Sequence, residues 1–183
     1  MKYLYQLDNN LQYIYYITPK CATRTFFNFF NYKSVDYKKL PEDCDDYFSW
    51  SFVRNPWDRL LSTYINKIIN KHDNGIGYNW SQSKCFKDFI LKVKDANITD
   101  CNRHIRGLYT FFPQDVDFVG KFENLQQDFD IICDKIGIPR QQLPHKNKTK
   151  HKHYTEYYDN ETREIVAKKY AKDIERFGYK FSE

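Results

Sequence analysis

The stretch from Tyr13 to Phe30, YIYYITPKCATRTFFNFF, constrains the fold more than any other part of the chain. Tyr13 to Ile17 is an unbroken run of β-branched and aromatic residues, which predicts a strand buried on both faces. A short loop with a lysine and several hydroxyl groups follows, and apolar residues then recur at helical spacing. A strand that leads through such a loop into a helix is the architecture of an anion-binding site.

The loop Thr18–Thr23 has the composition of an anion cradle. Backbone N–H groups and the positive end of the helix dipole face one spot there, and Lys20 adds a full charge. A nucleoside triphosphate P-loop is excluded, because GxxxxGK[ST] requires glycines and the first glycine of the chain is Gly75. The small residues Cys21 and Ala22 still allow a phosphate or sulfate to approach the backbone. An ordinary turn between strand and helix is the competing interpretation.

Length and composition favour one ordered domain spanning residues 1–183. The chain has 183 residues, six glycines, six prolines and 29% charged residues, enough for a real core. No run approaches the length of a membrane span, and the N-terminus lacks a basic-then-apolar signal pattern. The five cysteines are odd in number and form no CxxC pair. We therefore expect reduced thiols and a cytoplasmic location, not a disulfide framework or a zinc site.

The net charge of +5 is concentrated in one segment. Between Lys135 and Tyr154 there is no acidic residue, and five positive side chains lie there: Arg140, Lys146, Lys148, Lys150 and Lys152. A patch this local indicates a site for an anion more than a general attraction to nucleic acid. The histidines of the same segment form an H-x-H pattern without a nearby thiolate or carboxylate, which argues against a metal site.

A second constellation begins where the apolar run Trp50–Val53 ends. Asn55 is a good N-cap and Pro56 suits the first helical position, so a helix is expected to start at about residue 56. Arg54 then lies at the end of a strand, where ligands bind in open α/β sheets. Ser62 follows two turns into the helix. The alternatives are a salt bridge for Arg54 and a solvated helix position for Ser62.

Together, PKCATRT and FVRNPWDRLLSTY resemble the cofactor-binding motifs of sulfotransferases that use 3′-phosphoadenylyl sulfate, of the carbohydrate type that includes the chondroitin and heparan sulfate enzymes. The resemblance implies that the first loop wraps the 5′-phosphosulfate. It also implies that an arginine, and a serine eight residues later, bind the 3′-phosphate. The cofactor-binding residues implied are Lys20, Cys21, Ala22, Thr23, Arg24, Thr25, Arg54, Ser62, Lys148 and Lys150. Cys21-Ala22 departs from the family, where Gly-Gly or Ala-Gly is commoner.

The resemblance continues to the end of the chain. DFVGKF at 117–122 predicts a strand, and the ENL that follows it resembles the family's GRFENL segment. Residues 143–166 resemble its closing segment, a basic loop before a terminal helix that should run to Gly178. The implied fold is a P-loop-like three-layer α/β domain with a mainly parallel central sheet. Its strands are expected at 13–17, 50–54 and 117–121, and its helices from about residues 24, 56, 124 and 160.

Sulfuryl transfer requires in-line placement and stabilisation of the developing oxygen charge. Lys20 is the candidate catalytic electrophile at the bridging oxygen, and no metal is required because lysine and backbone donors supply the positive field. A hydroxyl acceptor needs a general base. His104 is the first candidate because an imidazole titrates near neutral pH, and the acidic cluster 42–46 is the second. The alternative interpretation is that His104 is a solvent-exposed loop residue without a catalytic role.

Three functions remain open on these grounds. The first is an enzyme that moves a sulfuryl group from 3′-phosphoadenylyl sulfate to a hydroxyl, with a carbohydrate as the expected acceptor. The second is a catalytically inactive protein of the same fold that binds the nucleotide. The third, a basic nucleic-acid-binding module built on residues 140–153, explains the lysines but not the spacing of Arg54 and Ser62. The sequence predicts neither the acceptor's identity nor the oligomeric state.

Overall fold

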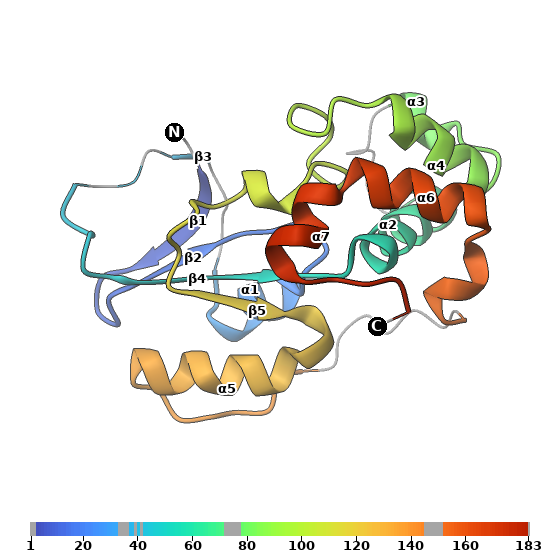
Figure 1. Ribbon diagram of the computed structural model, residues 1–183. Helices are drawn as coiled ribbons and strands as arrows, with labels where there is room; N and C mark the ends of the chain where they lie inside the picture. The colour runs from blue at the N-terminus through green and yellow to red at the C-terminus, as the bar shows by residue number, and fades with distance from the viewer. Residues whose placement is uncertain are drawn as a thin grey trace. The chain divides into compact units, whose positions relative to one another are not determined.

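The computed structural model describes residues 3–32, 37–38, 40, 42–71, 78–144 and 152–182 (Figure 1). The chain forms two compact units. The first comprises Met1–Val53 and Phe111–Thr149, and the second comprises Arg54–Thr110 and Lys150–Glu183. The expectation of a single domain over residues 1–183 stays a prediction.

The first unit is built on a sheet with the strand order β3-β1-β2-β4-β5 (Figure 1). The strands are β1 (Tyr3–Asp8), β2 (Tyr13–Tyr16), β3 (Tyr37–Lys38), β4 (Phe48–Val53) and β5 (Phe118–Lys121). The strand β4 pairs in parallel with both β2 and β5, while β1 pairs antiparallel with β2 and β3. The three predicted strands thus form the parallel part of the sheet, and the α/β fold class is confirmed.

A tight turn at Asp8 produces the hairpin of β1 and β2. The Asp8 carboxylate Oδ1 accepts hydrogen bonds from the backbone N–H groups of Asn10, at 3.0 Å, and Leu11, at 2.9 Å. A side chain that bonds to the backbone two or three residues onward stabilises a turn without any help from the rest of the fold. The hairpin sets the register in which Tyr5 faces Tyr16, and so fixes where β2 ends.

Helices α1 (Thr23–Phe29) and α5 (Leu125–Ile136) meet in an aromatic core against this sheet. The ring of Phe26 lies 5.4 Å from Tyr15, 5.3 Å from Trp50, 4.9 Å from Phe52 and 5.6 Å from Phe129, centroid to centroid. Rings at these separations gain more than their buried area alone provides. This core holds the first turn of α1, and hence the loop before it, against the ends of the parallel strands.

Packing against Phe52 explains why position 120, in the GKFENL segment, is a glycine. A Cβ atom at Gly120 would come within 2.6 Å of the Phe52 ring, its partner in the β4–β5 register. The Phe52 side chain is fully buried and cannot move away without disturbing the core. A larger residue at position 120 would therefore push β5 away from β4.

The second unit is helical. Its elements are α2 (Pro56–Tyr64), a π-helix (Ile65–Ile69) that continues α2, α3 (Tyr78–Ser81), α4 (Phe86–Asp95), α6 (Asn160–Lys169) and α7 (Ala171–Phe177), with 3₁₀ turns at Leu108–Thr110 and Tyr154–Tyr157. A fully buried apolar cluster joins them, including Leu60, Leu61, Phe89, Ile90, Val93 and Val166. Among the described residues, no helix has the length and apolar character needed to cross a membrane.

The terminal helix differs from the prediction of one continuous helix. It is broken at Tyr170, whose backbone (φ −106°, ψ 25°) ends α6 and begins α7. The apolar positions keep a helical spacing across this point, so periodicity alone does not reveal the break. Tertiary contacts explain it, because the buried Tyr170 hydroxyl donates to the Ile105 carbonyl oxygen. Helix α7 ends at Gly178 (φ 64°) as expected.

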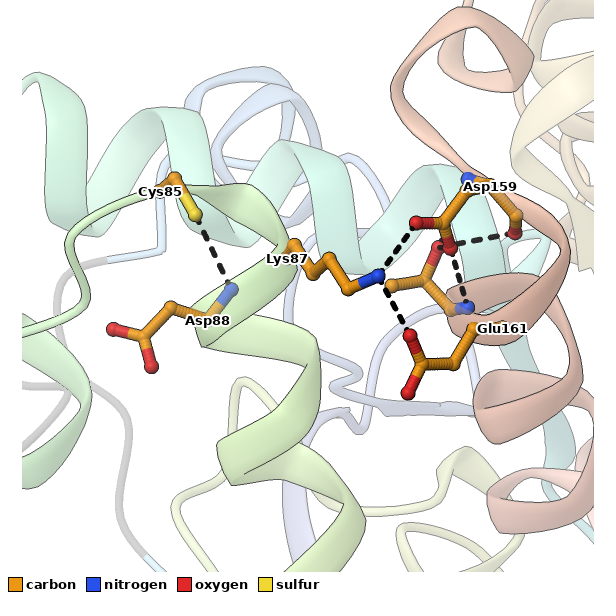
Figure 2. Close-up of polar contacts among 6 residues, drawn as sticks. Cys85, Lys87, Asp88, Asp159 and Glu161 are labelled. Atoms are coloured by element: carbon orange, nitrogen blue, oxygen red, sulfur yellow. Dashed lines mark hydrogen bonds and ion pairs between the residues drawn. The ribbon is translucent and has the colours of Figure 1, made fainter.

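Ion pairs join α4 to the start of α6 (Figure 2). Lys87 Nζ lies 2.9 Å from Asp159 Oδ2 and 2.6 Å from Glu161 Oε2. Asp159 also caps α6 by accepting from the Thr162 N–H at 2.8 Å, and this bond, together with Lys87, holds the pKa of the Asp159 carboxyl below its usual value. Exposed pairs of this kind contribute little stability, so we interpret them as setting the contact between α4 and α6.

Candidate functional site

The loop between β2 and α1 has an unusual backbone. Lys20 (φ 72°) and Ala22 (φ 63°) both adopt the left-handed conformation, which costs about 1–2 kcal/mol per residue with a Cβ atom. The Thr18 hydroxyl donates to the Phe52 carbonyl oxygen, and the Thr23 hydroxyl donates to the Thr18 carbonyl oxygen at 2.8 Å. These bonds tie the loop to the end of β4. Left-handed residues cluster at ligand clamps, and position 22 accommodates glycine without strain.

The predicted ligands of the 5′-phosphosulfate all belong to this loop and to the first turn of α1. Lys20 is half-buried, Cys21 is fully buried, and Arg24 is exposed. Thr25 is buried, with 7% of its surface exposed, and its N–H donates to the Ala22 carbonyl oxygen at 2.9 Å. The Thr25 amide thus has an acceptor at the cap residue of α1, and the assignment of Thr25 as a cofactor ligand stays a prediction.

Arg54 and Ser62 lie in the second unit: Arg54 just before α2, and Ser62 within it. The Asn55 side chain caps the helix by accepting from the Trp57 N–H at 3.1 Å, and Pro56 occupies the first position, both as predicted. Arg54 Nε and Nη2 donate to Asp58 Oδ2 at 2.9 and 2.8 Å, so the salt bridge considered as an alternative is present. Asp58 and Ser62 are four residues apart and lie along one face of α2, and Arg54, which precedes the cap Asn55, reaches this face through its pair with Asp58.

The closing segment of the chain holds the start of α2. Asn55 Nδ2 donates to the Lys180 carbonyl oxygen at 3.0 Å and to the Tyr154 hydroxyl at 3.3 Å. The Tyr158 hydroxyl donates to the Trp57 carbonyl oxygen at 2.8 Å, and burial raises the pKa of that hydroxyl well above its usual value. The sequence contains no periodic signal for Tyr154 or Tyr158, because they lie in and beside a 3₁₀ turn. Their role was visible only after folding.

His104 is buried, which corrects the alternative interpretation that it is a solvent-exposed loop histidine. Only 8% of its surface is exposed, and both ring nitrogens are shielded from solvent. Its N–H donates to Asn102 Oδ1 at 3.0 Å, and its carbonyl oxygen accepts from the Thr63 hydroxyl at 3.2 Å. The neighbouring Arg103 is exposed. The second candidate base, the acidic cluster 42–46 in the first unit, has exposed side chains at all four carboxylates.

The basic loop falls largely outside the described residues. Lys148 and Lys150, expected to close over the cofactor, lie there, as do His145 and His151. His153 is described, is exposed, and shares a hydrogen bond of 2.8 Å between Nδ1 and the Thr155 hydroxyl. Within the described ranges, no group of three histidine, cysteine, aspartate or glutamate side chains could hold a metal ion.

Comparison with known proteins gives a consistent family. The model of the sulfotransferase family matches residues 1–180. Carbohydrate sulfotransferase 14 of Danio rerio is 27% identical over 162 residues, which cover 73% of this chain and 44% of that protein. The Mus musculus protein of the same name is 27% identical over 111 residues, covering 51% and 30%.

An uncharacterized protein of Archaeoglobus fulgidus is 30% identical over 103 residues, covering 53% of this chain and 73% of that protein. The chain thus spans less than half the length of the named carbohydrate sulfotransferases. No solved structure matches it. Because the family match extends over almost the whole chain, from the strand before the Lys20 loop to the terminal helix, the protein belongs to the sulfotransferase family.

Proposed function

We propose that the protein transfers the sulfuryl group of 3′-phosphoadenylyl sulfate to a hydroxyl group of a carbohydrate acceptor. The observation that carries the proposal is that β2 and β4 are parallel neighbours. The Lys20 loop follows the carboxyl end of β2, and Arg54 follows the carboxyl end of β4. Because the two strands are parallel, these ends lie on the same side of the sheet, where ligands bind in open α/β sheets. The family match and the names of the two carbohydrate sulfotransferases support the reaction class.

In this proposal, two separate motifs bind the two phosphates of the nucleotide. Lys20 and the backbone of the loop bind the 5′-phosphosulfate, with the exposed Arg24 and the Thr23 backbone beside them. Arg54 and Ser62 bind the 3′-phosphate, and the planar guanidinium suits a phosphate because it can donate two parallel hydrogen bonds. Lys148 and Lys150 add charge from the basic loop.

The reaction proposed is an in-line displacement at sulfur. The acceptor oxygen forms a bond to sulfur, the bond from sulfur to the bridging oxygen of the 5′-phosphate breaks, and 3′,5′-adenosine diphosphate leaves with that bonding pair. The Lys20 ammonium stabilises the negative charge that develops on the bridging oxygen. The acceptor's proton passes to a general base, for which we propose His104.

The burial of His104 sets a condition on this role. Both ring nitrogens are shielded, so the imidazole must change rotamer, or its surroundings must open, before an acceptor can reach it. The bonds of the His104 carbonyl oxygen to Thr63 and of its N–H to Asn102 involve the main chain, so a rotamer change leaves these two bonds in place. Catalytic hydrogen bonds often form only in the complex with substrate.

A second candidate function is nucleotide binding without transfer. The shielding of the His104 nitrogens favours it, because a base that never reaches an acceptor catalyses nothing. The deciding experiment is incubation of the protein with sulfur-labelled 3′-phosphoadenylyl sulfate and a panel of glycans. Label on a glycan supports the transferase. Binding of 3′,5′-adenosine diphosphate without any labelled product supports the second function.

The base is tested separately by His104→Ala. We expect turnover to fall by about 100-fold or more, with unchanged affinity for 3′,5′-adenosine diphosphate, because a base contacts the acceptor and not the nucleotide. The rise of the rate with pH that an imidazole base produces should also disappear. If His104→Ala keeps the wild-type rate and pH profile, the base lies elsewhere, and alanine substitutions in the acidic cluster 42–46 are the next measurement.

A further inference from the structure

We propose that Arg59, Thr63 and Tyr170 are positioning residues that fix the segment 104–106 on helix α2 and thereby set the position of His104 for proton transfer. These three side chains are called the latch below. The inference rests on the proposed function, since it concerns the same base. It adds a role that none of the sequence motifs assigned, because Arg59 and Thr63 are neighbours of the predicted ligands without being ligands themselves.

The latch holds three consecutive carbonyl groups. The Thr63 hydroxyl donates to the His104 carbonyl oxygen at 3.2 Å. The Ile105 carbonyl oxygen accepts from the Tyr170 hydroxyl and, at 3.4 Å, from Arg59 Nη2. Arg59 Nη2 also donates to the Arg106 carbonyl oxygen at 2.7 Å. A stretch without regular secondary structure is thus held by side chains at nearly every peptide, which is how a scaffold makes a loop rigid.

The residues that follow are fixed in the same way. Asp173 accepts from the N–H groups of Leu108 and Tyr109 at 2.8 and 2.9 Å, and the Gly107 N–H donates to the Ile98 carbonyl oxygen at 3.0 Å. Burial raises the pKa of the Asp173 carboxyl, although the positive charge of Arg59 acts to lower it. The segment is therefore held at both ends as well as at its centre.

Burying the charged Arg59 side chain in a core is energetically unfavourable. Its side chain is fully buried, and its guanidinium lies 5.5 Å from the centre of the Tyr170 ring. Within the described residues it forms no ion pair, and its Nε and Nη1 atoms make no hydrogen bond. Burying a charge that has no opposite charge as a partner costs free energy. Stability alone does not call for this arginine, whereas placing two carbonyl groups does.

The geometry of α2 connects the latch to the proposed cofactor site. Asp58, which pairs with Arg54, and Ser62 lie along one face of the helix, and Arg59 and Thr63 follow one residue later, on the adjacent face. Helix α2 therefore carries Ser62, the partner of Arg54 and the donors that hold the His104 segment. Misplacing a reacting group by about 1 Å can cost about 100-fold in rate, so releasing the latch should impair turnover and leave nucleotide binding intact.

The test compares Thr63→Val with Thr63→Ser. Valine has nearly the shape of threonine but lacks the hydroxyl, while serine keeps it. Tyr170→Phe removes a second latch bond in the same way. The matched control is Ser51→Ala, which removes another buried bond from a hydroxyl to a carbonyl oxygen, 2.9 Å from Ser51 Oγ to the Tyr16 carbonyl oxygen, between β4 and β2 in the sheet of the first unit. We measure turnover, the KM of the acceptor, the affinity for 3′,5′-adenosine diphosphate by calorimetry, and thermal stability.

We expect Thr63→Val and Tyr170→Phe to lower kcat by about 10- to 100-fold with unchanged nucleotide affinity, and Thr63→Ser to keep the wild-type rate. Ser51→Ala should lower thermal stability without this loss of rate. The proposal is overturned if the two latch variants turn over like the wild type. It is also overturned if nucleotide affinity falls in parallel with the rate, because α2 as a whole has then been disturbed.

A failure of the proposed function is distinguishable from a failure of the latch. If the wild type binds 3′,5′-adenosine diphosphate but labels no acceptor, the transferase proposal fails and amide hydrogen exchange of residues 104–109 becomes the deciding measurement. Faster exchange in Thr63→Val and Tyr170→Phe, but not in Thr63→Ser, supports the latch. Equal exchange in all four proteins, wild type included, overturns it.

Discussion

The Lys20 loop and the start of helix α2, each proposed to bind one phosphate, are built by opposite means. The loop depends on its backbone: two non-glycine residues in the left-handed conformation are held by threonine hydroxyls that bond to main-chain carbonyl oxygens. The start of α2 depends on side chains: an asparagine cap, an arginine–aspartate pair and two tyrosines of the closing segment.

Because of this difference, substitutions in the two regions should have different effects. In the Lys20 loop, a substitution that leaves the side-chain charge unaltered should act mainly on the free energy of folding, because it changes the backbone strain. Substitutions at the start of α2 change charge or hydrogen-bond partners and act on phosphate affinity directly.

Lys20→Ala should reduce sulfuryl transfer by about 100- to 1000-fold, because the interaction with the bridging oxygen is strongest in the transition state. Thermal stability should stay unchanged, because alanine and lysine are equally strained at φ 72°. Assays of labelled transfer and thermal melts check both points. Lys20→Arg should fail too, since a planar guanidinium does not replace a compact ammonium. Full activity of Lys20→Ala would remove Lys20 from the mechanism, and full activity of Lys20→Arg would show that a guanidinium can replace the ammonium.

Arg54→Ala should weaken binding of 3′,5′-adenosine diphosphate by about 10- to 100-fold, the equivalent of a lost hydrogen-bonded charge pair. Affinity for 5′-AMP should not change, because that nucleotide has no 3′-phosphate. Calorimetry with both ligands measures the difference. Ser62→Ala is the milder companion variant, and equal affinities of the wild type for the two nucleotides would contradict the assignment of this site.

Tyr154→Phe should destabilise the protein by about 1–3 kcal/mol, because two donors lose their acceptor. The Tyr154 hydroxyl accepts from Asn55 Nδ2 and from the Ser182 N–H at 2.9 Å. The loss of a support for α2 should also lower affinity for 3′,5′-adenosine diphosphate while leaving 5′-AMP affinity intact. Denaturant unfolding and calorimetry are the measurements. Unchanged stability would mean that the closing segment does not hold the start of α2.

Ala22→Gly should stabilise the protein by about 1 kcal/mol, because glycine adopts φ 63° without the strain that a Cβ atom causes. The sign is the informative point: most substitutions in a binding loop destabilise. Ser182→Gly is a useful control, since Ser182 is also left-handed (φ 75°) but lies outside the proposed site. A destabilised Ala22→Gly would show that the loop is not strained.

Much of this architecture was readable from local pattern. The unbroken apolar run at Tyr13–Ile17 predicted a buried strand, and β2 occupies it. Asn55 and Pro56 predicted where α2 begins, because capping depends on neighbouring residues alone. Arg54 was predicted at the end of a strand and Ser62 two turns into the helix, and the structure has Arg54 directly after β4 and Ser62 within α2. Whether these residues bind a nucleotide stays a prediction.

The remaining features depended on contacts between residues far apart in sequence. Nothing local marks Tyr170 as a helix break, Tyr154 as a support for α2, or Arg59 as a donor to the His104 segment, since each partner lies more than 40 positions away. The burial of His104 was likewise missed, because a polar segment between helices reads as exposed. Amino-acid sequence by itself determined the strands, the helix starts and the family motifs, which follow from short-range sterics and hydrogen bonding. Only the tertiary structure decided which buried side chains hold the irregular segments, because unsatisfied backbone groups take partners wherever packing brings them close.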